Sequence, residues 1–368
     1  MIGTRGVPAR YGGFETAVEE IGSRLVTRGH QVTVYCRNPG QALREHKGMR
    51  LINLPALRRR SLETLTHTGL SVAHAVVREH PDVALVFNAA NAPFLPILKA
   101  AGIPVAVHLD GLEWKRAKWG GLGAAYYRGA ERWSVRLADA YIADARGIAD
   151  HIRGEHGREC VYIPYGAEIS HTDARRVAEL CLNPSGYHLV VARMEPENHV
   201  REIVRGFVAS EAVNPLVVVG SAPYSDLYTK SVHESAAGDA RVKFVGGIWD
   251  QGLLTDLYSG ALTYLHGHSV GGTNPSLLRA MGAGAPVIAH DNVFNREVTG
   301  GWARSFSSIE EVSEAIISDE SDPAAAAERA EHGRCHVAAN YRWDSVADDY
   351  QQLCLDLARR RSHKPVGQ

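Results

Sequence analysis

The sequence lacks the features of a membrane-spanning or secreted protein. Its 368 residues contain no apolar run of about 18 residues, the length that a membrane-spanning helix needs. The N-terminus lacks the basic, apolar and small-residue segments of a secretory signal, so we expect a cytoplasmic protein. The five cysteines are widely spaced and form no CxxC pair, which favours reduced thiols over disulfides or a zinc site.

Common nucleotide-binding motifs are also missing. No glycine pattern fits Gly-x-Gly-x-x-Gly or a Walker loop, which argues against a plain dinucleotide-binding fold and against a nucleotide hydrolase. The composition, with 45% hydrophobic and 22% charged residues, is typical of a globular chain, and the length suits two domains.

Short apolar runs alternate with helical stretches in both halves of the chain. This alternation predicts an α/β fold with two parallel, doubly wound sheets. Ligands of such sheets bind at the carboxyl ends of the strands, so we expect two domains that face a central cleft. The expected strands are 31–36, 51–54, 83–87, 105–108, 140–143, 160–163, 188–192, 216–220, 242–245, 261–265 and 286–289.

The predicted boundary lies near residues 168–186, where 183–186 has the composition of a turn. We expect an N-terminal domain over 1–170 and a C-terminal domain over 186–335. A final amphipathic helix within 336–368 is expected to pack back on the N-terminal domain.

The segment 3–15 is a glycine-rich loop that carries two arginines and leads into a helix near residue 14. Glycine lets backbone approach a ligand closely, and arginine grips phosphate oxygens, so the loop predicts an anion site. Only Met1 and Ile2 precede it, whereas a buried strand normally has about five residues. Either the first strand is a stub or the chain continues upstream, and we expect the latter.

The segment 266–278 is a second loop of this kind. Gly271, Gly272, Thr273 and Asn274 lead directly into an apolar helix pattern, which places unpaired N–H groups and the positive end of a helix dipole at one exposed point. A phosphate is the anion that best fits such a site. An ordinary helix N-cap with glycines in a turn is the alternative.

Charge is unevenly distributed along the chain. Residues 1–170 hold 22 Lys and Arg against 16 Asp and Glu, whereas residues 171–368 hold 18 against 25, giving +6 and −7. Arg58, Arg59 and Arg60 precede Leu62 and Leu65, so contact with an anionic membrane surface is possible beside the simpler explanation of a solvated face. No nucleic-acid recognition motif is present, and we expect no nucleic-acid partner.

The chain resembles the GT-B glycosyltransferases of family 4, and within them the bacterial rhamnosyltransferase-like branch. The resemblance covers nearly the whole chain and rests on several motifs in matching order. These are 3–15, 108–116, 163–167, 192–198 and 266–278.

The resemblance implies a retaining, metal-independent transfer of a sugar from a nucleotide diphosphate, without a cofactor. The donor would be a dTDP- or UDP-sugar, with L-rhamnose on dTDP favoured, and the acceptor a glycan or lipid-linked sugar of surface polysaccharide. Such an acceptor would place the enzyme at the inner face of the membrane. Developing charge on the leaving diphosphate requires cations and N–H donors. Residues of this sequence that match the donor-binding positions are Gly12, Gly13, Arg193, Asn198, His268, Gly271, Gly272, Thr273, Asn274 and Arg279.

These positions depart from the pattern of the family in two respects. Many members have glutamates where this chain has Gly271 and Arg279, and a ribose-binding carboxylate is therefore missing at the second position. Asn198 replaces a common lysine, with His199 beside it, so one cation fewer would face the diphosphate.

The acceptor side is expected at the segment after the strand that ends at His108. Asp110 and Glu113, together with Arg193, are the candidate catalytic residues, and Trp114 offers a stacking face. The alternatives are that Asp110 caps a turn, that Trp114 is core and that His108, His266 and His268 are hydrogen-bonded struts. The full set of acceptor candidates is Arg10, Tyr11, His108, Asp110, Glu113 and Trp114.

Three classes of function therefore remain open. The first is a sugar-nucleotide transferase. The second is a catalytically impaired sugar-nucleotide-binding homologue that acts as a partner or regulatory protein, which Arg279 favours. The third is another two-domain enzyme of this architecture, such as a sugar-nucleotide epimerase.

Overall fold

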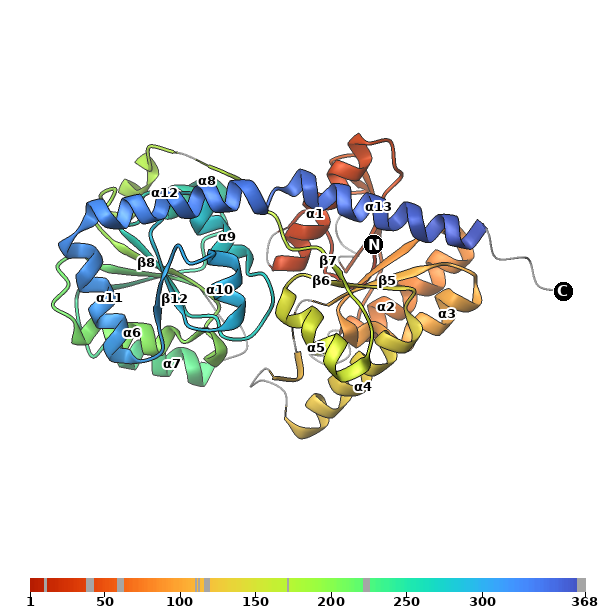
Figure 1. Cartoon of the computed structure of the whole chain (residues 1–368), viewed down its shortest axis with the longest axis horizontal. Coiled ribbons are helices and arrows are strands. Elements are labelled where there is room, and N and C mark those ends of the chain that lie inside the picture. The colour runs from red at the N-terminus through yellow and green to blue at the C-terminus, as the bar shows by residue number, and fades with distance from the viewer. Residues whose placement is uncertain are drawn as a thin grey trace. The chain divides into compact units, whose positions relative to one another are not determined.

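The computed structural model describes residues 1–9, 12–37, 43–57, 63–109, 111, 113–115, 120–170, 172–220 and 226–362. They form two compact units (Figure 1). The first unit is Met1–Gly166 with Trp343–Gln368, and the second is Ala167–Arg342. The second unit thus begins before the predicted linker and ends after the predicted limit at 335, because α12 (Pro323–Asn340) belongs to it.

The first unit contains two sheets with the strand orders β1-β3-β2 and β4-β5-β6-β7. All neighbouring strands are parallel except β2 and β3. The strands are β1 (Thr33–Cys36), β2 (Glu45–His46), β3 (Met49–Asn53), β4 (Ala84–Phe87), β5 (Val105–Leu109), β6 (Ala140–Ala143) and β7 (Val161–Tyr162).

Met1 and Ile2 lie between these two sheets. The N–H of Ile2 donates to Leu85 O (2.9 Å), and the N–H of Phe87 donates to Ile2 O (2.9 Å). On the other side, the N–H of Tyr35 donates to Met1 O (3.1 Å). The two residues therefore connect β1 with β4, and the glycine-rich loop 3–15 begins directly after them.

The helices of the first unit alternate with its strands, except for the last helix, which comes from the end of the chain. They are α1 (Gly13–Thr27), α2 (Glu63–His74), the π-helical η1 (Ala75–Glu79), the 3-10 turns η2 (Ala89–Phe94) and η3 (Glu113–Lys115), α3 (Leu95–Ala100), α4 (Gly121–Leu137), α5 (Arg146–His156) and α13 (Trp343–Ser362).

The second unit is built on one parallel sheet of order β10-β9-β8-β11-β12-β13. Its strands are β8 (His188–Val191), β9 (Leu216–Val219), β10 (Val242–Gly246), β11 (Thr263–His266), β12 (Val287–His290) and β13 (Arg304–Phe306). Its remaining helices are η4 (Arg175–Leu180), η5 (Pro196–Asn198), α6 (Val200–Ala209), α7 (Asp226–Ser235), α8 (Gln251–Ser259), α9 (Pro275–Gly282), α10 (Val293–Thr299) and α11 (Ile309–Ser321).

One face of this sheet is covered by α6, α7 and α11, and Figure 1 shows α6 and α7 together on that side. Val200, Ile203, Val204 and Phe207 recur at helical spacing on α6 and are fully buried against the strands. α12 packs on α9 and α10, so these helices form a second layer. The unit is therefore doubly wound, as the sequence predicted.

Every predicted strand overlaps a strand of the structure. β2 and β13 were not predicted, because β2 has two residues and β13 carries Arg304 and Ser305 in a three-residue strand. No helix among the described ranges has the length and apolar character that a membrane span requires. Arg58, Arg59, Arg60 and Leu62 lie outside the described residues.

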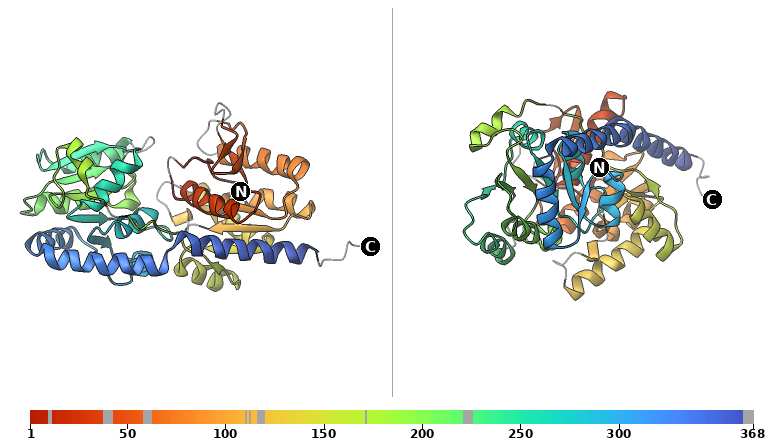
Figure 2. Two further views of the ribbon diagram at one scale, coloured as in Figure 1. Left: turned by 90° about the horizontal axis from the view of Figure 1, so that it is seen from above. Right: turned by 60° about the vertical axis from the view of Figure 1, so that its left-hand side comes forward.

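α13 lies along the first unit beside α1, as Figure 1 and the left view of Figure 2 show. Arg24 Nε donates to Asp344 Oδ1 (2.9 Å), and Arg28 Nη2 lies 2.7 Å from Asp348 Oδ1. The Tyr350 hydroxyl forms a buried hydrogen bond with His108 Nδ1 (2.6 Å) at the end of β5. The last segment of the chain thus completes the first unit.

We predict that Tyr350→Phe lowers the free energy of unfolding by about 1 to 3 kcal/mol, because it leaves the buried His108 nitrogen without a partner. Urea unfolding followed by circular dichroism measures this change. Tyr126→Phe is the matched control, because Tyr126 is partly exposed and water can replace its bond to Ala90 O. Equal losses in the two variants would contradict a special role for the Tyr350 contact.

Candidate active site

The strand order of the second unit creates a crevice at the carboxyl ends of β8 and β11. These strands are neighbours, but β9 and β10 follow on one side of β8 whereas β12 and β13 follow on the far side of β11. Their loops therefore leave in opposite directions, which is the arrangement that binds ligands in open α/β sheets. We call the loop 192–199 the arginine loop and the loop 267–274 the glycine loop.

The arginine loop and the glycine loop contact each other directly. The N–H of Ser269 donates to Glu197 O (2.9 Å), and His199 Nδ1 forms a hydrogen bond with Gly267 O (2.8 Å). A Cβ on Gly267 would lie 2.1 Å from Asn198 O, so only glycine allows this approach. The sequence prediction did not include Gly267, although a glycine between two histidines at a strand end is a signal for close backbone contact.

Arg193 follows β8 by two residues and is partly exposed. Its carbonyl oxygen accepts hydrogen bonds from Asn198 Nδ2 (2.8 Å) and from the N–H of Glu195 (2.8 Å), which fix the turn. Its guanidinium is 3.6 Å from Glu195 Oε1, a distance at which the charge remains available to a second anion. Asn198 is buried, so its amide positions Arg193, and we propose no direct ligand contact for its side chain.

The glycine loop ends at the N-terminus of α9. Asn274 Oδ1 accepts from the N–H of Ser276 (3.2 Å), so the Asn274 side chain is the N-cap that the sequence left open as an alternative. Gly271 has a positive φ of 144°, and no described atom lies within 4 Å of the position of a Cβ there. Gly272 and Thr273 are buried. Open space beside Gly271 lets an anion approach the backbone of this loop.

Four histidines surround the two loops as two stacked pairs. His266 and His268 stack with ring centroids 4.3 Å apart, and His199 and His290 also stack at 4.3 Å. Burial lowers the pKa of His266 to about 3, so this ring is neutral at pH 7. The His268 carbonyl accepts from Asn292 Nδ2 (3.0 Å) and Asn295 Nδ2 (2.9 Å), which anchors the glycine loop to α10.

Arg279, predicted to contact the donor, is bonded to α8 instead. Its guanidinium donates to Gln251 Oε1 (2.7 Å), Gln251 O (2.9 Å) and Thr255 Oγ1 (2.8 Å). It also lies over the ring of Tyr258, 5.6 Å from the centroid. Burial lowers the pKa of Arg279. These contacts make Arg279 a connection between α8 and α9, because most of its donors have partners within the unit.

The glycine-rich loop of the first unit has three glycines with positive φ, namely Gly3, Gly6 and Gly12. The N–H of Arg5 donates to Glu15 Oε1 (2.9 Å), so the first turn of α1 holds the loop. Gly12 precedes α1, and Gly13 is its first residue. The acceptor candidates Arg10 and Tyr11 lie outside the described residues.

A small cavity of about 10 Å³, which is room for about one water molecule, lies at the carboxyl ends of β4 and β5. Its polar lining residues are Glu113, Trp114, Tyr127 and Glu131, and its apolar lining residues include Leu109, Ile148 and Ile152. Trp114 is half-buried, and its Nε1 donates to Glu131 Oε2 (3.2 Å). Asp110, the candidate catalytic residue of this segment, lies outside the described residues.

His108, predicted to contact the acceptor, is 2% exposed. The rings of Phe14, Phe87, Tyr165 and Tyr350 surround it with centroids 5.4 to 6.3 Å away. Burial lowers the pKa of His108 to about 3. A ligand cannot reach this ring, so we assign His108 to the packing of the unit, in agreement with the strut alternative.

Comparisons with known proteins indicate the class of this site. Residues 12–166 match the family model of the Glycosyl transferase 4-like domain. No curated protein matches the sequence significantly. The structure is similar to sucrose-phosphate synthase from Thermosynechococcus elongatus, with a TM-score of 0.82 and 20% identity over 95% of this chain and 94% of that one.

Two further structures are similar over almost the whole chain. HepE of Anabaena in complex with UDP-glucose has a TM-score of 0.80 and 16% identity, over 95% of this chain and 98% of that one. A glycosyltransferase from Rickettsia africae has a TM-score of 0.72 and 14% identity, over 96% and 97%. The chain therefore has the GT-B fold that the sequence predicted, and the domain match supports a glycosyltransferase.

The buried histidines predict a loss of stability in mild acid. His67, His108 and His266 have pKa values of about 4, 3 and 3, mainly because of burial, whereas an unfolded histidine has about 6.5. Between these values the unfolded chain binds protons that the folded protein does not. Stability is therefore complete above about pH 6.5 and falls as the pH is lowered toward about 4.

Each of the three histidines should lower the free energy of unfolding by about 2 kcal/mol between pH 7 and pH 5, because the loss is about 1.4 kcal/mol per pH unit below 6.5. We predict that His266→Gln reduces the loss in the second unit by about 2 kcal/mol, measured by urea unfolding at both pH values. Exposed His332 provides the control variant His332→Gln. An unchanged acid sensitivity in His266→Gln would refute the assignment.

Proposed function

We propose that the protein is a retaining, metal-independent glycosyltransferase that moves a sugar from a nucleotide diphosphate to a glycan or lipid-linked acceptor. The observation that carries this proposal is the contact between the arginine loop and the glycine loop at the switch point of the second sheet. It brings a partly exposed guanidinium to the same sheet edge as an open glycine backbone and the N-terminus of α9. The family match over residues 12–166 supports the same class of reaction.

The donor diphosphate would lie on these two loops. As the bond to the sugar breaks, negative charge develops on the leaving phosphate, and Arg193 and the N–H groups of the glycine loop would stabilise it. Gly12 and Gly13 of the first unit are proposed to approach the same diphosphate. No side-chain nucleophile is needed where the departing phosphate takes the acceptor proton.

The donor would be a pyrimidine nucleotide sugar. HepE was crystallised with UDP-glucose, which supports a nucleotide sugar as donor here. The sequence resemblance favours dTDP-L-rhamnose. A panel of UDP- and dTDP-sugars in a thermal-shift experiment distinguishes the two, because a donor at about 100 times its Kd stabilises the protein by about 2.7 kcal/mol.

A catalytically impaired homologue is the second candidate, and Arg279 is the observation that favours it. The guanidinium occupies a helix position where many family members have a ribose-binding carboxylate, and its bonds to Gln251 and Thr255 hold it against α8. Such a homologue would bind the donor without turnover. Release of free nucleoside diphosphate, measured with and without acceptor, separates the two candidates.

The acceptor sugar would lie on the surface at η3, outside the small cavity, because that cavity has room for about one water molecule. Glu113 and Trp114 are half-buried there, so a sugar ring would stack on the indole and its hydroxyls would donate to the carboxylate. Asp110 remains the proposed base or orienting group for the acceptor hydroxyl.

A lipid-linked acceptor would require the first unit to approach the membrane surface, and α4 has a suitable face. Leu122, Tyr126 and Trp133 lie near one side of this helix and are 92%, 38% and 53% exposed. Arg128, Arg132 and Arg136 are also exposed, whereas Glu131, the acidic residue of the helix, is buried. Exposed Leu and Trp beside arginines are typical of helices that lie on anionic membranes.

We predict that Arg193→Ala lowers kcat/KM about 100-fold or more, on the scale of losing one donor that stabilises the transition state. Coupled detection of released nucleoside diphosphate measures this loss. Arg296→Ala is the matched control, because Arg296 is an exposed arginine of the same unit that pairs with Asp291. An Arg193→Ala enzyme within a few-fold of the parent would eliminate the assignment.

We predict that the double variant Leu122→Ser/Trp133→Ser binds anionic vesicles at least about tenfold more weakly than the parent protein. Each apolar side chain that enters the membrane contributes about 1.5 to 3 kcal/mol to the free energy of binding. Co-sedimentation with anionic and neutral vesicles measures the binding. The control is Leu227→Ser/Trp249→Ser, which removes an exposed leucine and an exposed tryptophan from the second unit. No binding by the parent protein, or equal binding by both variants, would exclude α4 as the membrane surface.

A further inference from the structure

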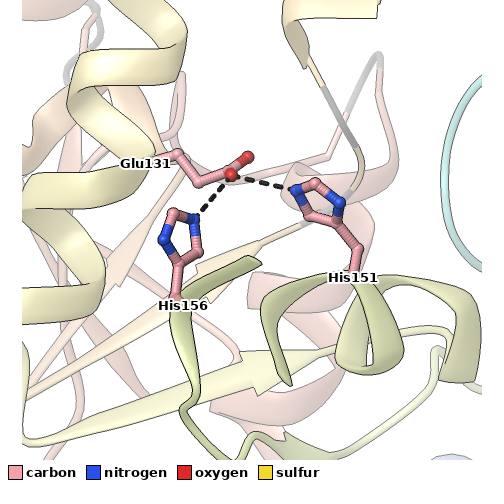
Figure 3. A group of neighbouring side chains, drawn as sticks. All are labelled: Glu131, His151 and His156. Carbon is pink, nitrogen blue, oxygen red and sulfur yellow. Dashed lines mark hydrogen bonds and ion pairs between the residues drawn. The ribbon is translucent and has the colours of Figure 1, made fainter. Parts of the chain in front are cut away.

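Glu131 of α4 and two histidines of α5 converge on one point in the first unit (Figure 3). His151 Nε2 and His156 Nε2 each lie 3.0 Å from the same atom, Glu131 Oε1. Among the described residues, this is the one group of three His, Cys, Asp or Glu side chains whose ligand atoms all lie within 4.8 Å of one another. We call these three residues the Glu-His-His cluster.

Among the described residues, the partners of the Glu131 carboxylate are the two imidazoles and the indole N–H of Trp114. Arginine and lysine are absent from this set. The Glu131 side chain is 11% exposed. A buried carboxylate needs either a charged partner or a metal ion, because burial of an unpaired charge is costly.

We propose that the Glu-His-His cluster binds a divalent transition metal ion, with Zn²⁺ as the best match. Two imidazole nitrogens and one carboxylate oxygen are ligands that zinc accepts, with bond lengths of about 2.1 Å. Tetrahedral ligands at that length lie about 3.4 Å apart, so the 3.0 Å separations need to open by only a few tenths of an ångström. Water would complete the coordination.

The surroundings of the cluster favour a defined site. The Trp114 indole donates to Glu131 Oε2 (3.2 Å), the carboxylate oxygen that does not contact the histidines. Such a bond fixes the orientation of a metal-binding carboxylate. His151 and His156 are partly exposed, with 18% and 14% of their side chains accessible, so an ion can enter from solvent.

The metal would connect three segments around the cavity. Glu131 belongs to α4, the histidines to α5 and Trp114 to η3, and both Glu131 and Trp114 line the cavity. A bound ion would therefore fix the wall at which we propose that the acceptor binds. We assign the ion a positioning role, because Glu131 and Trp114 are lining residues of the cavity.

The inference is independent of the proposed transferase activity, because its readouts are metal content and stability. Full-length protein stripped with a chelator is titrated with Zn²⁺ in competition with a chromophoric zinc chelator. We expect one tightly bound ion per chain and a rise of about 5 °C in the unfolding midpoint at saturating zinc. Bound Co²⁺ should show the intense visible absorption of a low-coordinate site.

Variants assign the ion to these residues. Glu131→Gln keeps the shape of the side chain but removes its charge. Glu131→Gln and the double variant His151→Ala/His156→Ala should each abolish the tight zinc site. Trp114→Phe keeps an aromatic ring but loses the N–H, and it should weaken zinc binding about 10-fold or more, which a purely structural tryptophan would not do. The control is His80→Asn, which removes an exposed histidine of the same unit at a left-handed position that asparagine tolerates.

Failure of the parent protein to bind zinc more tightly than the double histidine variant would overturn the proposal. The cluster would then be held by its hydrogen bonds alone, and the unfolding midpoint would not change with zinc. Zinc binding that persists in Glu131→Gln and in His151→Ala/His156→Ala would place the ion elsewhere and would equally overturn it. Circular dichroism of each variant confirms that a lost site is not a lost fold.

Discussion

The close backbone contact between Gly267 and Asn198 determines the geometry of the second unit's crevice. It requires a glycine, because any Cβ at residue 267 would lie 2.1 Å from the Asn198 carbonyl oxygen. The contact joins the two loops that leave the sheet in opposite directions at β8 and β11. Arg193 on one loop and the N-terminus of α9 on the other are thereby held at the same edge. Without this contact, the cation of one loop and the N–H donors of the other would not be held at the same edge of the sheet.

Some charged side chains have partners inside their own unit, whereas others remain available to bind a ligand. Arg279 is an example of the first kind, since three hydrogen bonds to α8 and the ring of Tyr258 account for its position. Arg193 belongs to the second kind, with one distant carboxylate beside it. This difference explains why two arginines that the sequence placed in the same site receive different roles. The buried His266 ring, which stacks on His268, is neutral and adds no charge beside the loops.

The first unit combines a small cavity with the Glu-His-His cluster, and Glu131 and Trp114 belong to the lining of the cavity. The Trp114 N–H also donates to Glu131. A change at Glu131 would therefore alter the cavity both directly and through Trp114. The proposed metal ion and the proposed acceptor would be coupled by these two side chains.

The sequence by itself determined the α/β class, the strand positions and the two glycine-rich loops. These features depend on local periodicity and on positions that only glycine can occupy. Eleven short apolar runs and the turns between them indicate parallel strands, whichever residues they later contact. Tertiary structure alone decided the roles of single side chains. His108 and His268 follow the same kind of strand-end pattern, yet the first is enclosed by four aromatic rings, one of which, Tyr350, comes from α13. The Glu-His-His cluster left no sequence signal, because Glu131 lies on α4 and the histidines lie at a spacing of five on α5. Contacts between residues distant in sequence depend on how helices pack, and local pattern does not encode that packing.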